Sequence, residues 1–257
     1  MLRTLSVLVV AALATLGLTT SAQAATVSYV ALGDSYSSGV GAGSYLDDSA
    51  CKRSANAYPY LYASKSSASL SFQACSGAKT TDVLNNQLGS LSSRTGLVSI
   101  TVGGNDAGFS TVMQDCILQG DSGCKTAIDN AVNFVENSLP ALLDKVYDAI
   151  ASKAPNADVV VLGYPHFYKI GGSCSVGLSD TSRGYINGGA DALDTVIAKR
   201  AANAGFKFAD VRSAFTGHEI CSGSPWLHSV TWPVDESYHP TAAGQASGYY
   251  PVFTAAF

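Results

Sequence analysis

Short apolar runs rich in β-branched residues recur along the chain, and each ends near a polar turn. The first four runs are followed by the turns GDS, CSG, GGND and GYP. Runs of this length that are bounded by Gly, Asn and Asp predict β-strands. The sequence therefore predicts five strands, of which the last is the weakest, over residues 27–32, 70–74, 97–102, 158–162 and 206–211.

Longer segments between these runs repeat apolar residues at helical spacing. One such face extends over residues 125–154, where Pro140 is expected to kink or interrupt the helix. A second helix is predicted over 185–204, and a third over 241–257, which Pro251 breaks near its end. Strands that alternate with helices favour an α/β fold in three layers, with helices on both faces of a mostly parallel five-stranded sheet.

The first 24 residues have the pattern of a secretory signal peptide. Arg3 supplies a positive charge, residues 5–18 form a short apolar core, and Ala22-Gln23-Ala24 is a small-x-small cleavage site. The apolar run is shorter than the roughly 20 residues that cross a bilayer comfortably, although a retained anchor is the alternative. We therefore expect an extracellular protein in which residues 25–257 form a single domain.

Charge and cysteine content narrow the partners of this domain. The full chain has a net charge of −4, which argues against a nucleic-acid partner because such proteins usually present a basic face. An even number of cysteines in a secreted chain predicts disulfides rather than a metal site. The sequence holds no CxxC pair, and the simplest pairing is sequential: Cys51–Cys75, Cys116–Cys124 and Cys174–Cys221.

The stretch ALGDSYSSGVG places Ser35 at the end of the first predicted strand. Gly, Asp and Ser are ordinary turn formers, so a simple turn is one interpretation. The other is a nucleophile, because GDS, CSG and GGND all follow strands whose carboxyl ends meet at one edge of a parallel sheet. A serine hydroxyl is not ionised at neutral pH, so an imidazole must accept its proton during attack.

Among the four histidines, His239 is the candidate base. It lies in DESYHPTAAG, where Pro240 fixes the backbone and Asp235 and Glu236 supply nearby carboxylates. The other three lack this combination and are interpreted as structural: His166, His218 and His228.

Three blocks of this sequence resemble those of the SGNH (GDSL) hydrolases. They are Gly33-Asp34-Ser35, Gly103-Gly104-Asn105-Asp106 and His239-Pro240, and they occur in the order of that family across nearly the whole mature chain. With its cysteines and signal peptide, the chain is similar to the secreted actinobacterial lipases, esterases and phospholipases A1 of the family. The resemblance implies a flavodoxin-like fold and a serine ester hydrolase.

The resemblance also implies a role for each matching position. Ser35 would be the nucleophile and would donate its backbone N–H to the oxyanion hole. Gly77 would donate a second backbone N–H, Asn105 would donate its side-chain amide, and His239 would be the general base. These roles suit the chemistry, because a tetrahedral intermediate needs preorganised donors and glycine lets a backbone N–H approach the substrate.

Simpler interpretations exist for some of these residues. Gly77 would also serve as a plain turn after Cys75, and Asn105 would also serve as the N-cap of a helix. Asp34 and Asp106 are interpreted as structural residues that accept hydrogen bonds from turn N–H groups.

The partner of the imidazole is open. Many family members have Asp three residues before the histidine, whereas this chain has Glu236 there, with Asp235 one step further back. Some secreted actinobacterial relatives use a Ser-His dyad in which a backbone carbonyl accepts the Nδ1 proton, and that of Ser237 is the candidate here. We favour the dyad and keep Glu236 as its rival.

A second GDS occurs at residues 120–123, in the sequence GDSG. Because it lies in the short span between Cys116 and Cys124, we interpret it as a surface turn within a small disulfide loop. The G-x-S-x-G sequence of conventional α/β-hydrolases does not occur.

The implied reaction is ester hydrolysis through an acyl-enzyme, with neither a metal nor an organic cofactor. We expect a monomer that contacts a lipid interface transiently and cleaves lipid esters, first acylglycerols and then phospholipid acyl esters. Alternatives are a main activity as phospholipase A1, a carbohydrate acetyl esterase, and a binding protein that has lost its activity. Aromatic residues near the blocks suggest an apolar acyl groove, or simply core packing: Tyr36, Tyr45, Tyr58, Tyr60, Tyr62, Phe109, Trp226 and Trp232.

Overall fold

Five parallel strands form the central sheet, in the order β2-β1-β3-β4-β5. The structure is a computed structural model that describes residues 26–47, 50–174 and 177–257. Its strands are β1 (Ser28–Gly33), β2 (Ser69–Phe72), β3 (Leu97–Thr101), β4 (Asp158–Leu162) and β5 (Lys207–Ala209). All five predicted strands are present, and the fifth is shorter than expected.

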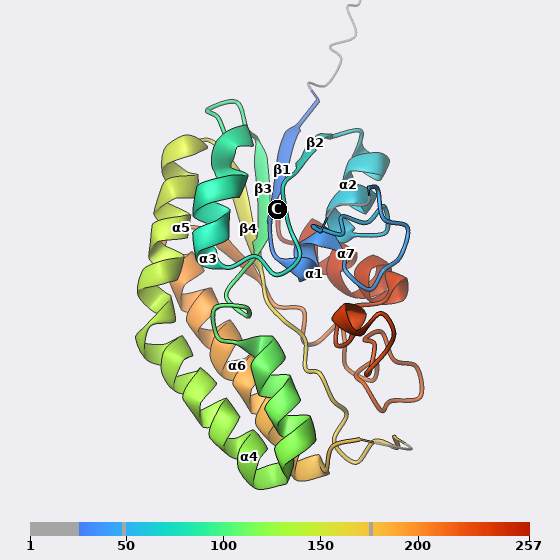
Figure 1. Ribbon diagram of the computed structural model, residues 1–257. Helices are drawn as coiled ribbons and strands as arrows, with labels where there is room; N and C mark the ends of the chain where they lie inside the picture. The colour runs from blue at the N-terminus through green and yellow to red at the C-terminus, as the bar shows by residue number, and fades with distance from the viewer. Residues whose placement is uncertain (1–25, 48–49, 175–176) are drawn as a thin grey trace, which may run out of the picture.

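Helices cover both faces of this sheet, which confirms the predicted α/β fold (Figure 1). Helices α5 and α6 lie on one side of the sheet, and α2 and α7 lie on the other. The helices are α1 (Ser35–Ser38), α2 (Tyr58–Ser66), α3 (Thr80–Asp82), α4 (Phe109–Asn137), α5 (Leu139–Lys153), α6 (Asp180–Asn203) and α7 (Tyr250–Thr254). Short π- and 3₁₀-helical segments occupy Val83–Gln87, Leu88–Ser90, Val234–Glu236 and Gly244–Tyr249.

The helix predicted over 125–154 is two helices, and the first begins earlier than expected. Helix α4 starts at Phe109, and Pro140 lies in the first turn of α5, where its missing N–H costs no hydrogen bond. The GDSG sequence lies inside α4 and not in a surface turn. Gly120 has non-helical angles (φ 65°, ψ −167°) and bends the helix, and the Cys116–Cys124 disulfide spans the bend.

Two other helix boundaries differ from the prediction. Helix α6 begins at Asp180 and not at Tyr185, because the side chain of Ser179 caps its N-terminus by accepting a hydrogen bond from the N–H of Ser182. The C-terminal helix continues past Pro251 to Thr254. A π-helical segment precedes Pro251, which therefore stands in the first turn of α7, where a proline is tolerated.

The other disulfides join Cys51 to Cys75 and Cys174 to Cys221, so the pairing is sequential. The predicted signal peptide, residues 1–24, lies outside the described residues. Within the described ranges, we find no helix with the length and apolar character that a membrane crossing requires.

Candidate active site

Ser35 is held at the turn between β1 and α1. Asp34 is the N-cap of α1, and its Oδ1 accepts a hydrogen bond of 3.0 Å from the N–H of Tyr36. Gly33 has a φ of +115°, and a Cβ there would lie 2.2 Å from the carbonyl oxygen of Thr101. Only glycine fits at this point, where β1 ends against its parallel neighbour β3, and Ser35 then takes the first position of a helix at the carboxyl end of the sheet.

The hydroxyl of Ser35 contacts the imidazole of His239. The distance from Oγ to Nε2 is 2.7 Å, and Nδ1 lies 3.0 Å from the backbone carbonyl of Ser237. Because a carbonyl only accepts, Nδ1 carries the proton in the neutral ring and Nε2 is free to accept one. This is the arrangement of a nucleophile and its general base.

The nearby carboxylates are engaged elsewhere. Oε1 of Glu236 accepts a hydrogen bond of 2.7 Å from the Tyr45 hydroxyl, and Oδ2 of Asp235 lies 2.5 Å from Nζ of Lys52. The Glu236 carboxylate therefore bonds to Tyr45 and not to the imidazole, which leaves the structure without support for Glu236 as the orienting group. The backbone carbonyl of Ser237 occupies that position, as in the dyad alternative.

Burial sets the protonation state of the imidazole. It lowers the pKa of His239 to about 4, although the hydrogen bond to the Ser237 carbonyl and the charge of Asp235 act in the opposite direction. The ring is therefore neutral at neutral pH, which is the state that a general base requires.

Gly77 and Asn105 line the same cavity as Ser35 and His239. Gly77 has a φ of +75°, and its surroundings leave open space where a Cβ would stand. Nδ2 of Asn105 donates a hydrogen bond of 3.0 Å to the carbonyl of Ala78, which leaves its second hydrogen available. Asn105 does not cap the following helix, because the N-cap of α4 is Gly108.

Both aspartates of the blocks hold turns together. Oδ1 of Asp34 accepts from the Thr101 hydroxyl at 2.6 Å, and Oδ1 of Asp106 accepts from the Thr80 hydroxyl at 2.6 Å. Burial raises the pKa of Asp34 to about 6 in spite of its hydrogen bonds. These contacts agree with the structural role that the sequence predicts.

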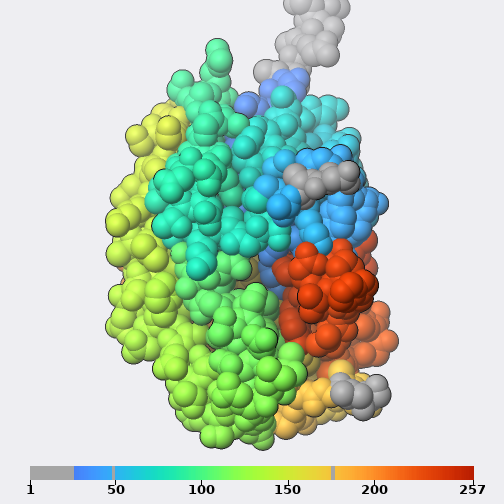
Figure 2. Space-filling view, in the orientation of Figure 1, coloured from blue at the N-terminus to red at the C-terminus, as the bar shows by residue number. Residues whose placement is uncertain are grey.

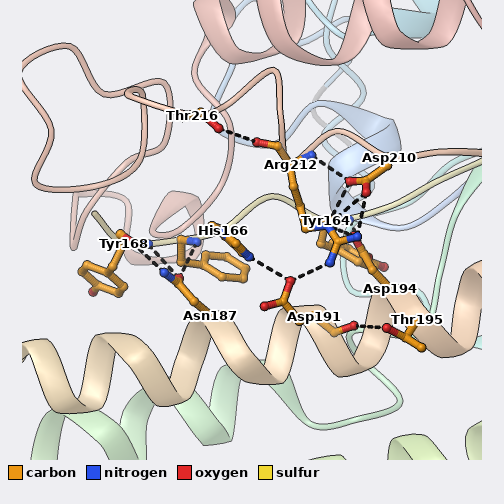
Figure 3. Close-up of polar contacts among 11 residues, drawn as sticks. Tyr164, His166, Tyr168, Asn187, Asp191, Asp194, Thr195, Asp210, Arg212 and Thr216 are labelled. Atoms are coloured by element: carbon orange, nitrogen blue, oxygen red, sulfur yellow. Dashed lines mark hydrogen bonds and ion pairs between the residues drawn. The ribbon is translucent and has the colours of Figure 1, made fainter. Parts of the chain in front are cut away.

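Tyr164 is a site residue that was not predicted from the sequence. Its hydroxyl donates to Oδ2 of Asp34 and accepts from the N–H of Gly104 at 3.3 Å, so it joins the first block to the second. Its own N–H donates to Oδ1 of Asp194 at 2.9 Å, and Arg212 lies beyond that carboxylate (Figure 3). The only signal in the sequence was its place in the GYP turn after the fourth strand.

The other three histidines have partners that account for them. Nε2 of His166 lies 2.8 Å from Oδ1 of Asp191 (Figure 3), and Nε2 of His228 lies 2.8 Å from the carbonyl of Gly41. His218 stacks on Trp226 with 3.6 Å between ring centroids. Within the described ranges, no group of three or more His, Cys, Asp or Glu side chains could hold a metal ion.

A cavity of about 200 Å³ extends from Ser35 and His239 between helices α4 and α6. Its walls are mostly apolar side chains of these helices and of the loops that precede them: Ala107, Phe109, Val112, Met113, Ile128, Ala131, Val132, Val135, Phe167, Ile186, Ala190 and Leu193. The start of α4 and the loop that carries His239 lie side by side beside this cavity (Figure 2). The ring centroids of Phe109 and Tyr238, one from each segment, are 6.3 Å apart.

Most of the aromatic residues that suggested a groove lie outside this cavity. Tyr36 and Phe109 do line it. Tyr58 and Tyr62 pack instead against Phe253 in the core beneath α2 and α7. The groove is therefore built mainly from aliphatic positions on two helices.

Comparison with known protein families agrees with the three sequence blocks. The sequence pattern of the GDSL-like Lipase/Acylhydrolase family matches residues 31–246, which include all three blocks.

Relatives from Streptomyces match almost the whole chain. It is 60% identical to Lipase 1 of Streptomyces coelicolor over 259 residues, which cover 98% of this chain and 96% of that lipase. The crystal structure of an extracellular lipase from Streptomyces rimosus superposes with a TM-score of 0.88 at 59% identity, covering 90% of this chain and 100% of that one. The crystal structure of phospholipase A1 from Streptomyces albidoflavus also gives 0.88, at 56% identity, covering 91% and 100%.

Proposed function

This chain belongs to the GDSL-like Lipase/Acylhydrolase family and is a carboxylic ester hydrolase, and we propose that it is a secreted enzyme that cleaves lipid esters with a Ser35–His239 dyad. One observation carries the proposal. The Ser35 hydroxyl lies 2.7 Å from Nε2 of His239 at the entrance of an apolar cavity, while the Ser237 carbonyl holds Nδ1.

Acylation begins when Oγ of Ser35 attacks the ester carbonyl carbon. Nε2 of His239 accepts the hydroxyl proton, and the ring becomes an imidazolium whose Nδ1–H stays on the Ser237 carbonyl. When the tetrahedral intermediate collapses, the imidazolium gives that proton to the leaving alcohol. The product is an acyl ester on Ser35.

Deacylation repeats these steps with water. His239 takes a proton from a water molecule that attacks the acyl carbon, and then returns a proton to Oγ of Ser35. The carboxylic acid leaves and the dyad is restored.

Three donors stabilise the oxyanion of each tetrahedral intermediate. They are the backbone N–H groups of Ser35 and Gly77 and the free Nδ2 hydrogen of Asn105, all on the wall of the cavity. Loss of one such donor typically lowers kcat by about 10²–10³. A Cβ at Gly77 would meet no atom within 4 Å, so there is room for a substrate beside this backbone.

The cavity supports a substrate with an apolar acyl chain. Aliphatic residues of α4 and α6 line it, which suits a hydrocarbon better than an acetyl group on a polysaccharide. Acylglycerols are the first candidates, since curated relatives at 60% and 61% identity are lipases of Streptomyces. Phospholipase A1 activity is the second candidate, supported by the Streptomyces albidoflavus structure.

Secretion is supported by three disulfides, which persist in oxidising compartments, and by the extracellular Streptomyces rimosus relative. The signal-peptide pattern of residues 1–24 is consistent with this location.

The test is hydrolysis of p-nitrophenyl esters from acetate to palmitate by the wild type, Ser35→Ala and Ser38→Ala. The hydroxyl of Ser38 makes one long hydrogen bond of 3.3 Å to a backbone carbonyl, so this variant is the matched control. We expect activity on medium and long chains that Ser35→Ala abolishes and Ser38→Ala retains. Activity confined to acetate would instead favour the carbohydrate esterase, and near-normal rates for Ser35→Ala would refute the nucleophile.

A further inference from the structure

Large apolar side chains are exposed on the loop that precedes His239. The exposed fraction is 62% for Val230, 88% for Trp232 and 64% for Val234. We call residues 229–237 the Trp232 loop. Single exposed apolar residues are common on protein surfaces, whereas several large ones on one short loop mark an interaction site.

Hydrogen bonds fix this loop to the catalytic machinery. The N–H of Thr231 donates to Oγ of Ser237 at 3.0 Å, and the N–H of Ser237 donates to the carbonyl of Val234 at 3.1 Å. Ser237 also holds Nδ1 of His239 through its own carbonyl. These bonds tie the two ends of the loop together next to His239, so its apolar side chains have a fixed place relative to the dyad.

The loop borders the cavity that holds the dyad. Asp235, the residue after Val234, lines this cavity together with His239. Figure 2 shows the red segment that contains this loop beside the green segment that begins α4. A surface that contacted Trp232 would therefore lie close to the cavity that Asp235 and His239 line.

We propose that the Trp232 loop docks the enzyme on the surface of neutral or zwitterionic lipid, with Trp232, Val230 and Val234 entering the interface. This inference rests on the proposed function, since it places the entrance of the cavity against aggregated substrate. An indole suits such a surface because its ring is apolar and its N–H stays hydrogen-bonded at the headgroup level.

Charge favours a lipid without net charge over an anionic one. The ionised groups beside the apolar tip are Asp235, Glu236 and Lys52, which together carry a net negative charge. The chain as a whole has a net charge of −4. Anionic lipids attract clusters of Lys and Arg, so the docking proposed here depends on apolar contact and is insensitive to salt.

The test uses vesicles of ether-linked phosphatidylcholine, which present a lipid surface to the enzyme but contain no carboxylic ester to cleave. Binding is measured by co-sedimentation and by tryptophan fluorescence for the wild type, Trp232→Ser and Trp232→Phe. The chain has two tryptophans, and Trp226 is stacked on His218, so Trp232→Phe identifies the source of any blue shift. Val27→Ser is the matched control, because Val27 is 42% exposed and directly precedes β1, at the opposite edge of the sheet.

We expect the wild type and Val27→Ser to bind with a blue shift at low and high salt. Trp232→Ser should bind at least about tenfold more weakly, because burial of a large apolar side chain exceeds the free energy of a tenfold change in affinity. Trp232→Phe should keep most of the binding and lose the blue shift. The proposal would be overturned if the wild type did not bind the vesicles, or if Trp232→Ser bound them as strongly as the wild type.

Two further measurements distinguish lipid docking from the proposed catalytic function and from dimerisation. The rate on soluble p-nitrophenyl butyrate should be the same in Trp232→Ser and in the wild type. Absence of that rate in the wild type would refute the proposed function, whereas the vesicle result would still decide the docking surface. If sedimentation velocity shows a dimer that Trp232→Ser dissociates, with vesicle binding unchanged, the loop is a contact between two copies and the lipid proposal fails.

Discussion

His239 receives its orientation from a backbone carbonyl in place of a carboxylate. The Ser237 carbonyl fixes which nitrogen carries the proton, which is half of what the aspartate of a triad does. The other half is stabilisation of the imidazolium, which a neutral carbonyl provides less strongly. Because Nδ1 is hydrogen-bonded to this carbonyl and not to a carboxylate, the protonated form of the imidazole is favoured less, and the buried ring stays neutral before attack.

We predict that Glu236→Gln retains most of the activity. The Glu236 side chain contacts Tyr45 and Lys52 and not the ring, and Gln keeps an oxygen that accepts from the Tyr45 hydroxyl. The kcat/KM on p-nitrophenyl butyrate should stay within about threefold of the wild type. A loss approaching the roughly 10⁴-fold drop seen when a triad loses its carboxylate would show that Glu236 completes a triad after all.

A second prediction concerns the acidic limb of the pH profile. With a pKa of about 4, His239 is about 90% neutral at pH 5, whereas an ordinary histidine with a pKa near 6.5 would be about 3% neutral. Since the base acts only when unprotonated, kcat/KM should rise with pH through about 4 and be nearly complete by pH 5.

Asp34 supplies the control for this profile, because its pKa is raised to about 6. Protonated Asp34 would lose part of its ability to accept from Thr101 and Tyr36. A limb near pH 6 that disappears in Asp34→Asn would belong to Asp34. A limb near pH 6.5 that persists in both proteins would contradict the low pKa of His239. Far-UV circular dichroism at each pH separates loss of activity from unfolding.

At the scale of elements, α4 and α6 form the substrate cavity where they lie against each other. Gly189 on α6 makes this approach possible, since a Cβ there would meet Cδ1 of Ile128 at 3.2 Å. The two helices thus meet at a position without a side chain, and the space beside it belongs to the cavity.

We predict that Gly189→Leu shortens the acyl chains that the enzyme accepts. The added side chain would fill part of the cavity, so p-nitrophenyl palmitate should be hydrolysed at least about tenfold more slowly, while acetate is little affected. Gly188→Leu is the matched control, because open space surrounds Gly188 on the exposed side of the same helix. Equal chain-length profiles for the two variants would mean that the acyl chain binds elsewhere.

The strands and the cavity differ in how far the sequence could predict them. Ser35, Gly77 and Asn105 each follow a strand, and a parallel sheet brings strand ends together, so their meeting was predictable. The cavity was not predictable, because apolar residues such as Ile128 and Val132 give the same helical sequence pattern whether they face the core or a pocket. The glycines of GDSG predicted a turn, whereas in the structure Gly120 forms a bend within α4, which the Cys116–Cys124 disulfide spans.

At the scale of the whole molecule, a series of buried polar contacts connects the active site through α6 to Arg212, in the segment that follows β5. It passes from Asp34 through Tyr164 to Asp194, which accepts from the Tyr164 N–H and lies 3.6 Å from Nε of Arg212 (Figure 3). Such long-range partners carry no local sequence signal, which is why Tyr164 and Asp194 were not predicted. Oδ2 of Asp194 has no hydrogen-bond partner among the described residues. This series of contacts therefore includes a buried carboxylate whose hydrogen-bonding capacity is only partly satisfied.

This carboxylate should make the stability of the whole protein depend on pH. Burial raises the pKa of Asp194 to about 8, whereas an unfolded Asp titrates near 3.9. Between these values the folded state binds a proton that the unfolded state has released, so the free energy of unfolding falls as the pH rises from about 4 to about 8. The sign is opposite to that of an aspartate stabilised by an ion pair.

We therefore predict that Asp194→Asn becomes more stable relative to the wild type as the pH rises. Its amide oxygen still accepts from the Tyr164 N–H, and Arg212 keeps Asp191 and Asp210 as partners. From about pH 5 to about pH 8, the variant should gain at least about 1 kcal/mol over the wild type in urea denaturation. Asp210→Asn is the control, because hydrogen bonds to Arg212 lower the pKa of Asp210, so its loss should destabilise equally at both pH values. If the difference between Asp194→Asn and the wild type does not change with pH, Asp194 is ionised throughout, and its pairing with Arg212 outweighs its burial.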